Sequence, residues 1–177
     1  MTLFFRRFIG ALMLDADAFE DIEAHRDADM QSVVVLLMAC GAGGMAAAGL
    51  AGTTAAGFAA GTVVVLGAWL VWVTVIAAIG TIALAEPQTN SSLHELLRTL
   101  GFAAAPAVFL VFAAIRTAAP FVLVLVAVWM VAAAVLGMRQ ALDYRSLPRA
   151  IAVCALGLIV SIVTIATIAG MFSVEVS

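Results

Sequence analysis

The chain has 177 residues, of which 66% are hydrophobic and only 11% are charged, and its mean hydropathy is +1.21. Soluble domains usually carry about 25% charged residues, so a soluble fold of this size would lack the polar side chains needed to cover its surface. The excess apolar surface must face lipid, and the sequence predicts an all-α, polytopic membrane helix bundle. The net charge of -3 gives no reason to expect binding to nucleic acid.

Residues 1–30 are predicted to form a segment with two parts. The first has apolar residues at helical spacing around Arg6 and Arg7, which is typical of an amphipathic helix lying in the membrane interface. The second part holds seven carboxylates from Asp15 to Asp29, which fit a solvated helical face or a docking surface for a basic partner. Because the acidic cluster follows the short apolar stretch at once, we interpret the segment as retained rather than as a signal peptide.

Uncharged runs divide residues 31–177 into membrane spans. Between Asp29 and Glu86 lie 56 residues without an Asp, Glu, Lys, Arg or His, which as one helix would be roughly 84 Å long, nearly three times the thickness of the hydrocarbon core. This run must contain two helices, with a turn at the glycines and threonines of 52–57. Later runs contain 17, 22 and 25 uncharged residues. We therefore predict five spans, near residues 31–51, 60–84, 97–115, 118–138 and 150–173.

The third of these spans carries two local signals. The sequence Ser92-Leu93-His94-Glu95 predicts a capping box, in which Ser92 and Glu95 bond to each other's backbone N–H groups at the start of the helix. Pro106 lies inside the span and should kink it, because proline cannot donate the helical hydrogen bond.

The arginines predict how the spans are oriented. With five spans, seven of the eight arginines fall on the side of the N-terminus and only Arg116 falls on the other side. Basic residues are enriched in cytoplasmic loops, so this distribution predicts a cytoplasmic N-terminus in a cell inner membrane.

The spans also limit the classes of function. No ionisable side chain lies well inside any of them, whereas proton relays and ion-coupled carriers usually place such groups at membrane depth. Cys40 and Cys154 lie in apolar runs and have neither a neighbouring base nor further metal ligands. We therefore expect a protein that is not an enzyme and has no metal or cofactor. Transport of a neutral or lipidic solute remains open.

Small and aromatic residues indicate where the spans pack. Gly41 and Gly44 in the first span, and Gly57 and Gly61 at the entrance to the second, allow helix backbones to approach closely. These glycines serve either packing within the chain or a homo-oligomer face. The three tryptophans, Trp69, Trp72 and Trp129, lie near the middle of their spans. They are predicted to pack or face lipid, with a hydrophobic ligand groove as the alternative.

Polar residues flanking the third, fourth and fifth spans form the candidate binding surface. They are Arg98, Arg139, Asp143, Tyr144, Arg145 and Arg149. Arg139 and Asp143 are four residues apart, so we expect them to share a helix face. We also predict that Arg98 pairs with Asp143 across the bundle. This loop either fixes a helix end at the membrane surface or binds a partner or lipid headgroups.

Several of these segments resemble one protein family. The stretches 98–106 (RTLGFAAAP), 128–129 (VW), 139–144 (RQALDY) and 149–150 (RA), with 8–12 (FIGAL), are similar to bacterial members of the Yip (Ypt/Rab-interacting protein) family. The resemblance implies a five-helix membrane domain with a cytoplasmic N-terminus, and it implies no catalytic residues. The eukaryotic relatives' binding of Rab-type GTPases is not carried over, because their Asp-Leu-Tyr-Gly-Pro-like stretch is absent here.

The sequence therefore predicts a non-catalytic membrane scaffold or accessory subunit that recruits a partner through its cytoplasmic loops. Its expected partners are membrane lipids and a protein at the cytoplasmic face, with a homo-oligomer or a larger membrane complex as further alternatives.

Overall fold

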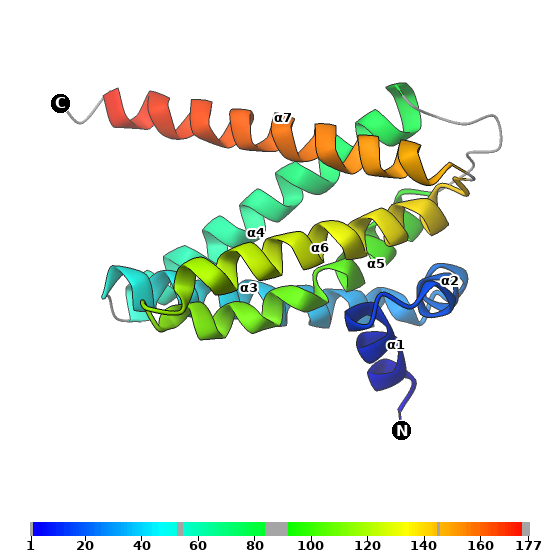
Figure 1. Cartoon of the computed structure of the whole chain (residues 1–177), viewed down its shortest axis with the longest axis horizontal. Helices are drawn as coiled ribbons and strands as arrows, with labels where there is room; N and C mark the ends of the chain where they lie inside the picture. The colour runs from blue at the N-terminus through cyan, green and yellow to red at the C-terminus, as the bar shows by residue number, and fades with distance from the viewer. Residues whose placement is uncertain (1, 53–54, 84–91, 145, 175–177) are drawn as a thin grey trace.

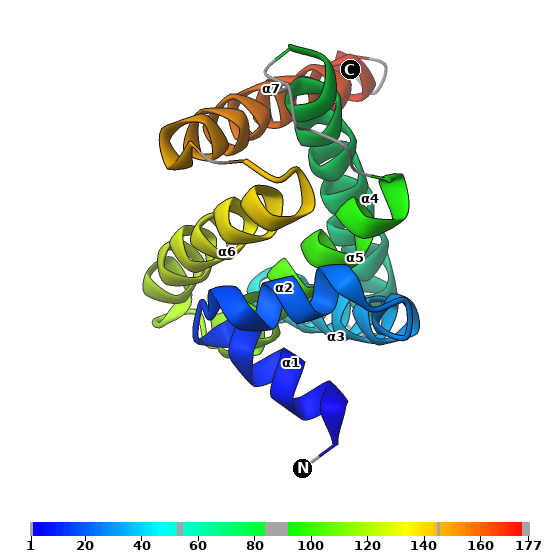
Figure 2. The same ribbon diagram turned by 90° about the vertical axis from the view of Figure 1, so that its right-hand side faces the viewer.

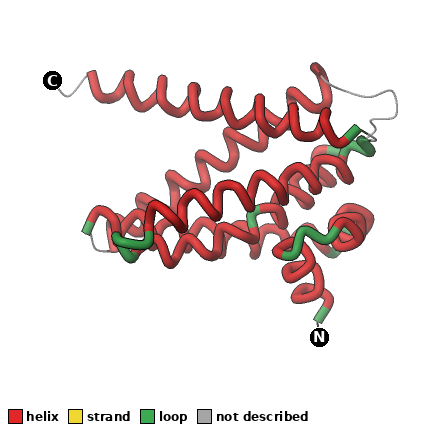
Figure 3. Tube along the Cα trace, in the orientation of Figure 1, coloured by secondary structure: helices red, strands yellow, loops and turns green. Residues whose placement is uncertain are grey.

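The computed structural model describes residues 2–52, 55–83, 92–144 and 146–174, with the side chains of the last helix described as far as Ser161 and again at Val163. Within these residues every regular element is helical (Figure 3). The α-helices are α1 (Leu3–Leu12), α2 (Ala16–Ala24), α3 (Ala28–Ala51), α4 (Ala55–Ala78), α5 (Leu93–Ala103), α6 (Ala119–Ala141) and α7 (Leu147–Val174). A π-helix, η1 (Ile79–Ala83), continues α4, and a 3-10 helix, η2 (Ala105–Ala114), continues α5. The all-α prediction is confirmed.

Four helical stretches are long and apolar enough to cross a membrane. They are Ala28–Ala51, Ala55–Ile82, Leu93–Ala114 and Ala119–Ala141, and they match the first four predicted spans. In α7 the apolar helix with described side chains, Leu147–Ser161, is shorter than a full crossing requires. The remainder of the fifth predicted span lies outside the described side chains, so that span stays a prediction.

The long helices define two ends of the molecule. In Figure 1, α3, α5–η2 and α6 run side by side, α4 crosses them diagonally, and α7 lies over α4 and α6. Figure 2 shows α2 lying across one end of this bundle. We call this the polar end, and it also holds the start of α5 and the loop after α6. The opposite end holds the C-terminus of α3 and the turn between η2 and α6. At that end Gly52 caps α3 with a φ of 67°, which glycine adopts without strain.

Glycines bring α3 unusually close to α5 and η2. A Cβ atom built on Gly101 would lie 2.8 Å from the Cβ of Ser32, and one on Gly49 would lie 2.7 Å from the Cβ of Ala114. These two contacts lie at opposite ends of α3, so the helices run parallel and in contact along their length. Such close approach favours dispersion contacts where lipid supplies no hydrophobic driving force.

The third span forms as its local signals predict. Ser92 Oγ accepts the backbone N–H of Glu95 at 3.2 Å, and Glu95 Oε2 accepts the N–H of Ser92 at 2.8 Å, so the capping box is confirmed. The α-helix ends at Ala103, and Pro106 lies at the start of η2. The proline therefore interrupts the α-helix, and the span continues with 3-10 geometry.

The N-terminal helix α1 contacts α5, η2 and α3 and projects from the bundle, with the N-terminus pointing away from the long helices (Figures 1 and 2). Phe4, Phe8 and Leu12 pack partly buried against the core, whereas Phe5 and Met13 remain 52% and 75% exposed. The carbonyl of Leu12 accepts a hydrogen bond of 2.9 Å from the indole N–H of Trp129. The amphipathic helix is thus present, and its exposed apolar face is of the kind that enters a membrane interface.

Candidate functional site

The polar end is organised around two buried arginines that the sequence placed at the surface. The first is Arg7 of α1, whose side chain is only 1% exposed. Its Nε donates to Asp21 Oδ2 at 2.7 Å, while its Nη1 and Nη2 donate to the two carboxylate oxygens of Asp27 at 3.1 and 3.2 Å. Nη1 also reaches Gln31 Oε1 at 3.1 Å. One guanidinium therefore joins α1 to α2 and to the start of α3.

Arg7 changes the chemistry of the acidic segment. Its hydrogen bond, together with its positive charge, lowers the pKa of Asp27 despite some cost of burying the carboxylate. The predicted solvated face is therefore wrong for Asp21, which is 22% exposed, whereas Asp27 is 54% exposed while it also binds Arg7. Asp17 and Glu20 do remain exposed. The signal that the sequence offered for these contacts is Arg7 itself, because a guanidinium that becomes buried requires acidic partners within reach.

The second buried arginine is Arg98 of α5, which is 4% exposed. Its Nη1 donates to Asp29 Oδ1 at 2.9 Å, and its Nη2 donates to the backbone carbonyl of Glu23. The predicted pair of Arg98 with Asp143 is therefore wrong. The reason is the parallel packing described above: Gly101 lies against Ser32, and one turn earlier on each helix stand Arg98 and Asp29.

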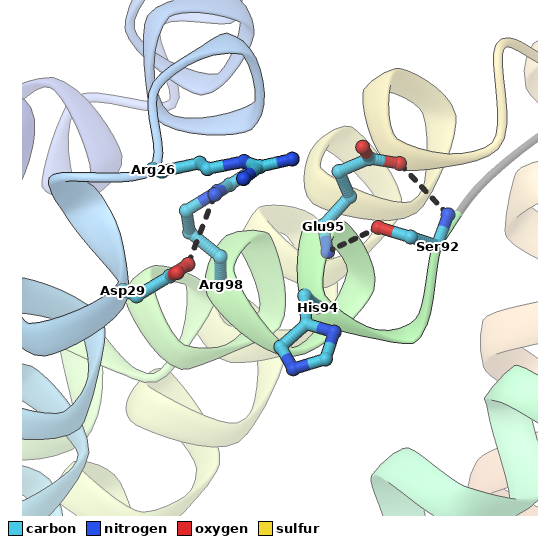
Figure 4. Close-up of a pocket in the computed structure, with 6 residues that line it drawn as sticks. All are labelled: Arg26, Asp29, Ser92, His94, Glu95 and Arg98. Carbon is cyan, nitrogen blue, oxygen red and sulfur yellow. Dashed lines mark hydrogen bonds and ion pairs between the residues drawn. The ribbon is translucent and has the colours of Figure 1, made fainter.

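A polar pocket of about 370 Å³ opens beside this second arginine. It is lined by Arg26, Asp29, Ser92, His94, Glu95 and Arg98 (Figure 4). Arg98 and Asp29 are held in place by their ion pair, and Ser92 and Glu95 by the capping box. Arg26 and His94 are exposed, and within the described part of the chain neither side chain makes a hydrogen bond or ion pair. The pocket thus presents two available basic groups on a fixed polar frame.

Carboxylates of the pocket and of the neighbouring segments influence Glu23. Burial raises the pKa of Glu23, and the negative charges of Glu95 and Asp143 raise it further, while Arg98 acts in the opposite direction. These carboxylates come from α2, α5 and the loop after α6. The polar end therefore combines charges of both signs.

The loop after α6 is turned inward at Tyr144. This side chain is 3% exposed, and its hydroxyl donates to the carbonyl of Gly80 in η1 at 2.6 Å. Gly80 allows the approach, because a Cβ atom there would lie 2.7 Å from Leu142 Cδ1. Tyr144 is therefore a packing residue, and it does not offer its ring to a partner.

The other residues of this loop are arranged differently from the prediction. Helix α6 ends at Ala141 and Asp143 has a φ of 52°, so the predicted shared helix face of Arg139 and Asp143 is wrong. Arg139 Nε lies 3.4 Å from the carbonyl of Tyr144, which it reaches as the chain turns back. Asp143 and Arg139 are exposed, Arg149 is half-buried, and Arg145 lies outside the described residues.

Compared with protein-family models, with curated proteins and with solved structures, the chain matches none of them. The resemblance to the bacterial Yip family therefore stays a prediction, and the functional argument depends on the chain's own residues.

The predicted packing glycines fall into distinct environments. A Cβ atom on Gly44 would collide with Thr62 Oγ1 and lie 2.8 Å from the carbonyl of Phe58, and one on Gly61 would lie 2.7 Å from the Cβ of Ala47. Gly44 and Gly61 thus pack α3 directly on α4. Gly41 faces open space, with no atom within 4 Å of a built Cβ, and Gly57 is half-buried in the first turn of α4.

Proposed function

We propose that this chain is a non-catalytic membrane scaffold or accessory subunit of the Yip-like type, which binds a protein partner at its polar end. The proposal includes a cytoplasmic location for that end in the bacterial inner membrane, with five spans in total. The arginine distribution supports this orientation, because seven of eight arginines belong to the segments at the N-terminal side.

The observation that carries the proposal is that the polar end, including the frame around the pocket, is held rigidly. Arg7 and Arg98 each join segments distant in sequence, across 14–24 and 69–75 residues respectively. A surface built in this way loses little conformational entropy when a partner binds, which favours recognition. Arg26 and His94 stand on this surface as available donors, and arginine is enriched among residues that dominate binding energy.

The residues of the pocket are also engaged in ways that suit binding better than catalysis. The hydroxyl of Ser92 accepts a backbone hydrogen bond and Glu95 accepts another, so both side chains serve the helix start. A nucleophile would need a base within hydrogen-bond reach that takes its proton. In this proposal the exposed residues Arg26, His94, Arg139 and Asp143 contact the partner.

The test is isolation of the protein from its native membrane in mild detergent, followed by quantification of co-purifying chains by mass spectrometry. A partner present in fixed stoichiometry should be lost, by at least about ten-fold, in Arg26→Glu. Arg116→Glu is the matched control, because Arg116 is also exposed but lies at the opposite end. Purification of the chain alone, or of companions retained equally by both variants, would contradict the proposal.

A second candidate function is permeation or transport of a neutral or lipidic solute. The observation that favours it is an apolar cavity of about 230 Å³ among α3, α4 and η2. Flux of a neutral solute into liposomes that contain the purified chain would test this candidate. Flux equal to that of protein-free liposomes would exclude it for that solute.

A further inference from the structure

The apolar cavity lies at a different depth from the polar pocket and is lined differently. Small side chains leave the space open: Ala39 on α3, Ala68 on α4, and Ala104 and Ala107 near η2. The indole rings of Trp69 and Trp72 form a further part of its wall. Both tryptophans lie near the middle of the candidate span Ala55–Ile82, well away from either end of the bundle.

The two tryptophans carry polar groups that nothing in the described structure satisfies. Each side chain is 8% exposed, and each indole N–H is buried without a hydrogen-bond acceptor among the described residues. In the hydrocarbon region no water is available to bond such a group, so an unsatisfied donor is costly there. Trp129 shows the alternative, since its N–H is bonded to the Leu12 carbonyl at 2.9 Å.

Size and polarity together define what would fill this space. A cavity of about 150 Å³ accommodates benzene in other proteins, so about 230 Å³ suits a fused pair of rings. At this depth the occupant must be neutral, because a charge would be expensive. The two donors require an acceptor, and a carbonyl oxygen with two lone pairs can accept from both.

We propose that the cavity between α3, α4 and η2 binds a neutral, apolar molecule of bicyclic size whose carbonyl oxygen accepts hydrogen bonds from Trp69 and Trp72. Both nitrogens are covered by neighbouring atoms, so the proposal requires the indole rings to turn their N–H groups toward the cavity when the molecule binds. This site is independent of the scaffold proposal, because none of its lining residues belongs to the polar pocket.

The test compares two probes of equal shape, 1-tetralone and tetralin, which differ in the carbonyl group. Purified protein in detergent should bind one 1-tetralone per chain, about five- to thirty-fold more tightly than tetralin, as one or two net hydrogen bonds of about 1 kcal/mol each imply. The carbonyl stretching band of the bound ketone should move to lower frequency. Equal affinities for the two probes, or an unshifted band, would overturn the proposal.

Variants locate the binding. The double variant Trp69→Phe/Trp72→Phe keeps an aromatic ring at each position, although a smaller one, and removes both donors, so it should bind both probes equally. Trp129→Phe is the matched control and should keep the preference for the ketone. Ala68→Leu fills the cavity and should weaken both probes at least ten-fold. Helicity and monodispersity confirm folding of each variant, and a ketone preference that survives in the double variant would refute the assignment.

Discussion

At the scale of single residues, α3 carries two glycines, Gly44 and Gly41, in different environments. Gly44 is pressed against α4, whereas Gly41 faces open space. We expect Gly44→Ala to lower the free energy of unfolding by about 1–3 kcal/mol, because the new methyl group forces α3 and α4 apart. Gly41→Ala should be neutral or stabilising by up to about 1 kcal/mol, since alanine favours the helix. Denaturation in detergent measures both, and equal effects would contradict this packing.

The environment of Glu23 leads to a prediction about how stability depends on pH. Its pKa is raised in the folded protein by burial and by the charges of Glu95 and Asp143. Protonation of Glu23 therefore stabilises the fold, fully below the unfolded pKa of about 4.3, and this stabilisation is lost as pH rises through the higher folded pKa. Glu23→Gln imitates the protonated form. It should raise Tm at pH 7 by about 1–2 °C, a shift kept small by partial exposure to solvent.

The pH dependence of this variant is the critical measurement. Below about pH 4 the wild-type carboxyl is itself protonated, so the difference in Tm should vanish. Glu20→Gln is the control on the same helix, because Glu20 is exposed and its replacement should change Tm far less. A stabilisation by Glu23→Gln that persists unchanged at low pH would show that the effect is unrelated to ionisation.

At the scale of elements, the Arg7 guanidinium joins α1 and α2 to the start of α3, in addition to the core packing of Phe19 and Ile22. Arg7→Gln would leave the carboxylates of Asp21 and Asp27 close together without their shared cation. Removing one partner from a buried ion pair is strongly destabilising, and the exposure of Asp27 moderates the loss here to about 2 kcal/mol. We expect α1 and α2 to show faster hydrogen exchange, while α6 exchanges at the wild-type rate.

The neighbouring arginine supplies the control for this prediction. Arg6 is exposed, so Arg6→Gln should leave the exchange of α2 unchanged. If both variants loosen α2 to the same degree, net charge rather than the specific contacts of Arg7 holds the segment in place.

At the scale of the whole molecule, we expect the polar end of the bundle to face the cytoplasm. In a variant with Cys40 and Cys154 replaced by alanine, single cysteines at Ser92 and Thr117 mark the polar and the opposite end. Both positions are exposed. A membrane-impermeant maleimide should label Thr117→Cys in intact cells and Ser92→Cys only after permeabilisation. The reverse pattern would place the N-terminus outside the cytoplasm.

The sequence by itself determined the helical class, four candidate spans and the start of α5. These features depend on local properties: the length of an uncharged run, the capping box at Ser92 and the missing N–H of Pro106. A hydrophobic run long enough to cross a bilayer must form a helix there, because every backbone polar group needs a partner within the segment. No knowledge of other segments is required for that conclusion.

Only the tertiary structure decided which polar residues meet. Arg98 bonds to Asp29 at a separation of 69 residues, and Tyr144 bonds to Gly80 at a separation of 64. These pairings depend on the direction and register of packed helices, which glycines such as Gly101 set through backbone contact. The sequence offered several carboxylates for each arginine, and a charge attracts all of them alike. Shape complementarity between helices, a property of the whole bundle, selects the partner.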